Sequence, residues 1–326
     1  MRRVFGVVLL GFGLASLMTG GVCETELHLI PRDEAIPGDA VKMTPETDTF
    51  PPVLHSSEFE DPVPIPGPVN TAGAEDAPVI SRDGNWFFFA FVPDVRVPPE
   101  KQLIDGATGT YWSRRTGKGW TEPERLVLND DVSLDGPMCI RGFELWFASV
   151  RAGNYRQHGD LYVAEYAGGE WGNWLNAGER LNAQDSVGEN SLTPDGSRML
   201  FHRPGFGGHG GYDLWEMEWV DGDWGQPVNL GPVVNDERYE GMPWVSRDGN
   251  EVWFNRTSSE GYPGPALYRT FRTDSGWTTP EEIVSSFAGD PGLDDEGNLY
   301  FVHHYYTGTD PIQMIEADIY VCYRRK

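Results

Sequence analysis

The chain has 326 residues, with 40 glycines, 25 prolines, 13% aromatic residues and a formal net charge of −25. So acidic a protein lacks the clustered lysine and arginine that phosphate backbones require, which excludes a nucleic-acid partner. The many glycine, proline and aromatic residues, without long stretches of helical periodicity, predict short strands joined by turns.

The first 22 residues are expected to be a signal peptide. Arg2 and Arg3 precede an apolar run over residues 4–18, and small residues follow, which is the order of a charged segment, an apolar core and a cleavage site. The run is short for a membrane-spanning helix, so we expect no transmembrane span in the mature chain. Cys23 leaves two alternatives open, lipidation of this cysteine or ordinary cleavage. We therefore expect export to the periplasm or the extracellular space, with a membrane anchor in the first case.

Residues 23–57 follow as an acidic, proline-rich segment without hydrophobic periodicity. Such a composition buries little apolar surface and is typical of disordered linkers. We therefore expect a linker here and a folded domain over residues 58–326.

The folded part repeats one unit. A glycine after a charged residue ends a turn in each copy, with spacings of 58, 54, 53 and 48 residues, at Gly84, Gly142, Gly196, Gly249 and Gly297. An aromatic or aliphatic strand follows each glycine, then a loop, a second strand, and an element that opens with an aromatic residue. Each unit thus predicts four short antiparallel strands. Since one such sheet cannot cover both of its faces, radial packing of the copies, a β-propeller, is predicted.

The ends of the chain predict how the ring closes. The last unit supplies three strands before Lys326, and residues 59–68 repeat the aromatic and proline spacing of the fourth element elsewhere. We therefore predict an all-β fold, a five-bladed β-propeller of four-stranded antiparallel blades in which the N-terminal strand (59–68) completes the last blade. A six-bladed ring is the alternative if part of residues 24–57 is ordered.

Two stretches are similar almost position for position. Asn70 and Asn235 each stand 14 residues before the glycine of an SRDG turn, and Glu75 matches Glu240. The SRDG or TPDG turn, the GGYDLW strand and the WGQPVNLG element resemble the TolB-type, WD40-like (PD40) propeller repeat over about residues 59–326. This resemblance implies a propeller fold and a family of periplasmic scaffolds and binding proteins with a minority of enzymes. It informs the fold more than the activity.

The sequence predicts neither a metal site nor a cofactor. Cys139 and Cys322 fall in strands that are not neighbours, so both are expected to be buried and free. Neither has a second ligand at metal-binding spacing, and adjacent His303 and His304 must face opposite ways on one strand. No phosphate-binding glycine loop and no serine elbow occurs.

Acidic and basic residues alternate around one predicted face. Loops that lead into the innermost strands are acidic in every unit, and loops after the second strands carry arginine or histidine, Arg96 in the first unit. The candidates for a binding face are Glu75, Asp135, Glu189, Glu240, Asp290, Arg151, Arg203, Arg256, His303 and Tyr305. Repetition in all units also favours a purely structural interpretation, in which each arginine pairs with a carboxylate and holds the loops in register.

Two functions remain as hypotheses. The first is an exported, non-enzymatic and monomeric propeller that binds an envelope protein or a glycan through this loop face, with no catalytic residue. The alternative is a glycoside hydrolase that resembles the arabinanase-like five-bladed enzymes, which implies Asp76 as base, Asp135 as pKa modulator and Glu189 as acid.

Overall fold

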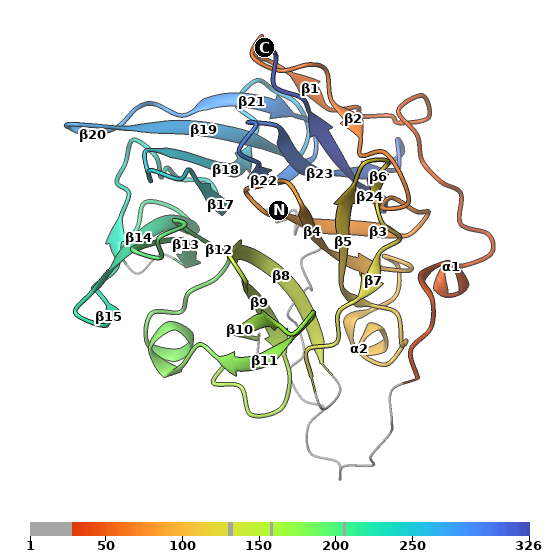
Figure 1. Cartoon of the computed structure of the whole chain (residues 1–326). Helices are drawn as coiled ribbons and strands as arrows, with labels where there is room; N and C mark the ends of the chain where they lie inside the picture. The colour runs from red at the N-terminus through yellow and green to blue at the C-terminus, as the bar shows by residue number, and fades with distance from the viewer. Residues whose placement is uncertain (1–27, 130–132, 157–158, 205–206) are drawn as a thin grey trace.

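The computed structural model describes residues 28–129, 133–156, 159–204 and 207–326 (Figure 1). The expected signal peptide and Cys23 lie outside these residues. Strands dominate the described part, with two short α-helices, α1 (Arg32–Ala35) and α2 (Pro99–Gln102), and one π-helical turn, η1 (Arg180–Gln184). No helix in this part is long and apolar enough to cross a membrane. The predicted all-β class is confirmed.

In each of the first four units, four strands pair in antiparallel order, and short additional strands join some of these sheets. In chain order these strands are β3 (Ala74–Ile80), β4 (Trp86–Val92), β5 (Gly109–Thr116) and β7 (Glu124–Arg125); β8 (Leu134–Arg141), β9 (Glu144–Val150), β10 (Asp160–Ala167) and β11 (Glu170–Asn176); β12 (Asn190–Leu192), β13 (Arg198–Pro204), β14 (Tyr212–Val220) and β16 (Val228–Asn229); β17 (Gly241–Val245), β18 (Glu251–Thr257), β19 (Pro265–Thr273) and β21 (Glu281–Ser285). Three two-residue strands, β6 (Gly119–Trp120), β15 (Asp223–Trp224) and β20 (Gly276–Trp277), form hairpins with the ends of the third strands.

The strands of the last unit join those of the first unit, because β24 (Met314–Cys322) pairs in parallel with β3 at Ala317 and Ala74. β22 (Ala288–Leu293), β23 (Leu299–Tyr306) and β24 pair in antiparallel order. The N-terminal strand β2 (Val63–Pro64) pairs with β24, and an isolated bridge joins Phe59 to Arg324. The outer edge of β24 therefore pairs with a two-residue strand from the N-terminal part of the chain.

The sheets are arranged around a common centre with their first strands innermost (Figure 1). These innermost strands contact one another in the order β3, β8, β12, β17 and β22, and β22 also contacts β3. Apolar side chains fill the space between adjacent sheets; Trp171 of β11, for example, packs 5.3 Å from Phe88 of β4 between ring centroids. This radial packing is the arrangement of a β-propeller.

The SRDG turn has a local structure that explains its sequence. Ser81 Oγ donates a hydrogen bond of 2.6 Å to Asp83, and Ser246 repeats this bond in the fourth unit. The glycine that follows has a φ of 69° at Gly84 and 70° at Gly249, values that side chains with a Cβ rarely adopt. The motif therefore forces the chain to reverse between the first and second strands.

Cys139 and Cys322 are buried and free, as predicted. Burial raises the pKa of each thiol to about 12. Both are therefore protonated at neutral pH and act as small apolar side chains of the core.

The N-terminal segment, residues 28–57, differs from the expected disordered linker because it is ordered against the sheets. Its strand β1 (Val53–Leu54) pairs antiparallel with β21, Val53 opposite Ser285. Lys42 forms ion pairs with Glu316 and Asp318 of β24. Composition did not predict this order because single buried ion pairs and backbone bonds, rather than a large apolar surface, hold the segment in place.

Candidate functional site

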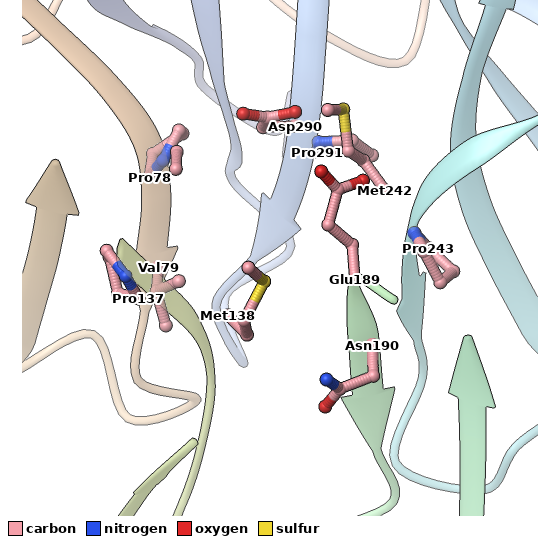
Figure 2. A pocket seen from close by; sticks show the side chains of 11 residues that line it. Pro78, Val79, Pro137, Met138, Glu189, Asn190, Met242, Pro243, Asp290 and Pro291 are labelled. Carbon is pink, nitrogen blue, oxygen red and sulfur yellow. The ribbon is translucent and has the colours of Figure 1, made fainter. Parts of the chain in front are cut away.

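A pocket lies where the innermost strands meet at the centre of the molecule. It encloses about 370 Å³ of empty space, part of it open to solvent. Its walls come from all five innermost segments and are mostly proline and methionine, with two carboxylates, and consist of Ala77, Pro78, Val79, Pro137, Met138, Glu189, Asn190, Met242, Pro243, Asp290 and Pro291. Figure 2 shows that the side chains of Glu189 and Asp290 lie at the same end of the pocket, beside Met242.

The backbone of the innermost strands explains why these side chains reach the pocket. Ala77, Met242 and Asp290 have φ values of 49°, 52° and 55°, and each precedes a proline. The strand pairing shifts register at each of these points. Such bulges bend an edge strand, and proline fits an edge because no neighbouring strand needs its N–H. Asp290 therefore occupies a strained position that directs a carboxylate to the axis.

Asp290 is the least compensated charge of the site. Its side chain is 8% exposed, and neither carboxylate oxygen has a hydrogen-bond partner among the described residues. Burial, followed by the negative charges of Asp76 and Glu189, raises the pKa of Asp290 well above its ordinary range. Three carboxylates from three of the repeated units therefore lie close together at the axis.

Glu189 lies just before β12 and faces a small aromatic cluster. Its Oε2 is 3.0 Å from His202 Nδ1 but makes no hydrogen bond with a described residue. The His202 ring packs edge-on against Tyr212 and Tyr239. Burial and the charge of Glu189 raise the pKa of Tyr239 well above its ordinary value. Tyr239 is therefore a neutral hydrogen-bond donor at neutral pH.

Asp76 lies beside Asp290 and is bonded more fully. Its Oδ1 accepts a 2.8 Å bond from the N–H of Ala77, and its Oδ2 is 3.4 Å from His304 Nε2. Burial and the charge of Asp76 raise the pKa of Tyr306 to about 12. The imidazole of His304 thus orients Asp76 behind the pocket.

The other acids of the loop face form structural pairs. Arg151 Nη2 lies 2.9 Å from Asp135 Oδ1, and Arg256 Nη1 lies 3.7 Å from Glu240 Oε1. Glu75 is paired with Arg32 of the N-terminal segment, at 3.2 Å. All three guanidinium groups lie above a cross-strand phenylalanine–tyrosine pair, namely Phe147–Tyr162 for Arg151, Phe254–Tyr268 for Arg256 and Phe89–Tyr111 for Arg32. These groups hold the loops in register, which is the structural interpretation of the repeated arginines.

Two predicted basic residues have different partners from those expected. Arg96 is exposed and pairs with Asp94 of its own loop. Arg203 lies 4.0 Å above the Trp215 ring and donates to the Asp185 carbonyl. Neither is paired with a carboxylate of the pocket.

His303 and Tyr305, predicted on the binding face, are buried instead. His303 Nε2 lies 2.7 Å from Asp48 of the N-terminal segment, and the Tyr305 hydroxyl lies 2.8 Å from that of Tyr320. His304 faces Asp76, so the two adjacent histidines do point in opposite directions, as predicted. The N-terminal segment covers His303. The composition of that segment did not predict that it is ordered, so the burial of His303 was not predicted either.

The predicted carboxylate trio is only partly assembled. Glu189 lines the pocket and Asp76 lies beside it, whereas Asp135 is paired with Arg151 and is not part of the pocket wall. Asp290, and not Asp135, is the third carboxylate near Asp76 and Glu189. Among the described residues no group of three or more histidine, cysteine or acidic side chains is positioned to hold a metal ion.

No protein-family model and no curated protein matches this chain. Several solved propeller structures are similar to it. A TolB protein from Agrobacterium tumefaciens is 14% identical, with a TM-score of 0.44, over 78% of this chain and 92% of that chain. TolB from Acinetobacter baumannii is 14% identical, with a TM-score of 0.40, over 73% and 53%. A xylan β-1,4-xylosidase from Bacillus halodurans is 12% identical, with a TM-score of 0.46, over 78% and 54%.

The expected resemblance to TolB-type propellers is found, and TolB structures are among the matches. At these identities the likeness concerns the fold. The activities of the similar proteins are therefore not transferred to this chain.

Proposed function

We propose that this chain is an exported, non-enzymatic, five-bladed propeller that binds an envelope protein or glycan at the mouth of its central pocket. The mature protein is a monomer under this proposal. Its signal peptide ends at residue 22, and Cys23 carries a lipid anchor in one of two versions of the proposal.

The blade count is supported by the contacts of the innermost strands, which return from β22 to β3. Closure by residues 59–68 is supported by two equivalent asparagines. Asn70 exchanges two hydrogen bonds with the backbone of Ile319 on β24, and Asn235 exchanges the same two bonds with Leu214 on β14. The proposal is therefore that β2 fills the outer position of the last blade.

One observation carries the proposed binding function: Asp290 is buried at the axis without a hydrogen-bond partner among the described residues. An unpaired buried carboxylate destabilises a fold, so its retention favours a role outside folding. In contrast, the acids at Glu75, Asp135 and Glu240 each have an arginine nearby. Asp290 breaks this pattern, and Glu189 has the imidazole of His202, 3.0 Å away, in place of an arginine.

The test compares variants of the pocket for retention of an envelope partner. Wild type, Asp290→Asn and the control Glu124→Gln, whose side chain is exposed on β7, are immobilised and exposed to an envelope fraction. We expect a defined protein or glycan to be retained by wild type and by Glu124→Gln, and to be lost from Asp290→Asn. Equal retention by all three proteins would contradict binding at the pocket.

A second candidate, a glycoside hydrolase, is favoured by the crowding of Asp76, Glu189 and Asp290. A carboxyl group that keeps its proton to high pH suits a general acid, and a second carboxylate suits a base. Asp290 replaces Asp135 in this version. Release of reducing ends from a polysaccharide panel by wild type, and not by Glu189→Gln, would establish it and exclude the non-enzymatic proposal.

A further inference from the structure

We infer that the central pocket binds a primary ammonium group on an apolar chain, either a small amine or the lysine side chain of a protein partner. This inference rests on the proposed binding function and names the chemistry of the bound group.

The acceptors of the pocket match an ammonium group in number. Both oxygens of Asp290 and Oε2 of Glu189 lack a hydrogen-bond partner among the described residues. Both residues are 8% exposed, so solvent satisfies their carboxyl groups poorly. An ammonium group has three N–H donors and no acceptor. One such group placed between Asp290 and Glu189 has a donor for every unpaired oxygen.

The walls of the pocket match an apolar stem. Met138 and Met242 contribute thioether side chains, and four prolines contribute ring carbons, at positions 78, 137, 243 and 291. Thioethers adapt to alkyl groups of different shapes. Long cationic side chains commonly place their methylene groups against such surfaces while the charged end finds polar partners.

No cation among the described residues of the pocket wall already fills this role. These residues include neither lysine nor arginine. Arg82 lines the adjoining pocket further along the innermost strands, where its guanidinium lies 4.7 Å from the Trp244 ring centroid. The described wall therefore offers acidic side chains without a basic one, and the net charge of −25 adds to the attraction of cations.

The chain itself contains an ammonium group bound in the same way. Lys42 inserts between the carboxylates of Glu316 and Asp318, with its ammonium 5.8 Å from the Tyr305 ring centroid. Glu316 and Asp318 are both nearly fully buried. Asp290 and Glu189 form a comparable acidic pair at the axis without such a lysine.

Binding is expected to be linked to proton release. Asp290 faces the carboxylates of Asp76 and Glu189, and these face His304 and His202 in turn. The described groups around the site also include the hydroxyls of Tyr212, Tyr239 and Tyr306. Because a bound cation stabilises the ionised form of Asp290, it lowers the pKa of that carboxyl and displaces its proton. Affinity should therefore increase up to tenfold per pH unit while Asp290 is protonated in the free protein.

The experiment is calorimetric titration of the full-length protein with three probes. N-acetyl-lysine methylamide and n-butylammonium supply the ammonium group, and N-acetyl-norleucine methylamide is the uncharged match. We expect saturable binding of at least one ammonium probe and none of the norleucine probe. A tighter lysine derivative indicates a protein side chain as the natural source, and a tighter butylammonium indicates a small amine.

Two variants and one control make the test decisive. Asp290→Asn and Glu189→Gln should each weaken ammonium binding at least tenfold, whereas Glu124→Gln should stay within twofold of wild type. Thermal melts establish that each variant is folded. Absence of ammonium binding to wild type, or equal binding by a folded Asp290→Asn, would overturn the inference. If the ammonium probes fail while an envelope partner still requires Asp290, only the inference fails; if the partner ignores Asp290, the proposed function fails.

Discussion

Arg32 Nη1 lies 3.2 Å from Glu75 Oε1, and both side chains are buried. In the fourth unit Arg256 Nη1 lies 3.7 Å from Glu240 Oε1, the equivalent acid. The first unit has Phe91 at the position that corresponds to Arg256, seven residues after the turn glycine. The N-terminal segment therefore supplies the cation that the first sheet lacks.

Replacement of Arg32 by methionine should destabilise the fold strongly. Removing one partner of a buried ion pair leaves the other charge uncompensated, which costs about 3–5 kcal/mol. Glu75 would be that charge. The free energy of unfolding in denaturant measures the loss, and Arg96→Met, at an exposed pair, is the control, expected within about 0.5 kcal/mol of wild type. Equal unfolding of the two variants would mean that the Arg32–Glu75 pair contributes nothing to the fold.

The stability of the protein should be greatest near pH 5. Burial raises the pKa of Glu75 and Glu316 to about 7 and that of Glu240 to about 8. A raised carboxyl pKa contributes stability below its unfolded value, near 4.5, and this contribution is lost as pH rises through 7 to 8. Hydrogen bonds and ion pairs lower the pKa of Glu58 and Asp236 to about 2, which removes stability as pH falls from 4 to 2.

Melting temperature as a function of pH measures this profile. Glu240→Gln carries no titrating group at that position, so its melting temperature should fall less between pH 5 and pH 8 than that of wild type. A wild-type melting temperature that rises over this interval would contradict the burial of these carboxyls.

Asn70 and Asn235 should be equally important for stability if β2 completes the last blade. Each asparagine satisfies a backbone N–H and a backbone carbonyl on the third strand of a sheet. Replacement by alanine leaves those groups without partners, which costs about 1–3 kcal/mol per group. Unfolding in denaturant should show similar losses in the free energy of unfolding for Asn70→Ala and Asn235→Ala. A silent Asn70→Ala beside a costly Asn235→Ala would argue against closure by the N-terminal strand.

Ala77→Gly should stabilise the protein. Ala77 has a φ of 49°, where a Cβ is strained and glycine is not. Relief of this strain is expected to exceed the larger unfolded-state entropy of glycine, for a net gain of about 0.5–1 kcal/mol. The measurement is the free energy of unfolding, and a loss of stability would show that contacts of the alanine methyl group outweigh the strain.

The sequence predicted the fold well because the turns dictate it. A glycine with positive φ after Asp83 or Asp248 marks the same reversal in the chain, and the aromatic strands that follow define each sheet. The sequence also predicted which loops are acidic. Composition did not predict the order of residues 28–57, because Arg32, Lys42 and Asp48 act through individual ion pairs that no periodicity reveals.

The membership of the central site was only partly predictable. Blade position suggested Asp76, Asp135 and Glu189, and the structure brings Asp76 and Glu189 together with Asp290. Strand bulges and the arginine that captures Asp135 decide which carboxylates reach the axis. One feature of the sequence could have predicted the role of Asp290. It is an acidic residue before a proline, whereas the equivalent positions in other units hold Ala77 and Met242.

The titration of Asp290 tests most directly whether unpaired carboxylates meet at the axis. Carbon-detected NMR of aspartate-labelled protein, with the Asp290 signal assigned by its loss in Asp290→Asn, gives the apparent pKa of this carboxyl. We expect a value well above the ordinary range for aspartate, lowered in Asp76→Asn because one negative neighbour is gone. An Asp290 that titrates near pH 4 in both proteins would contradict the proposed site.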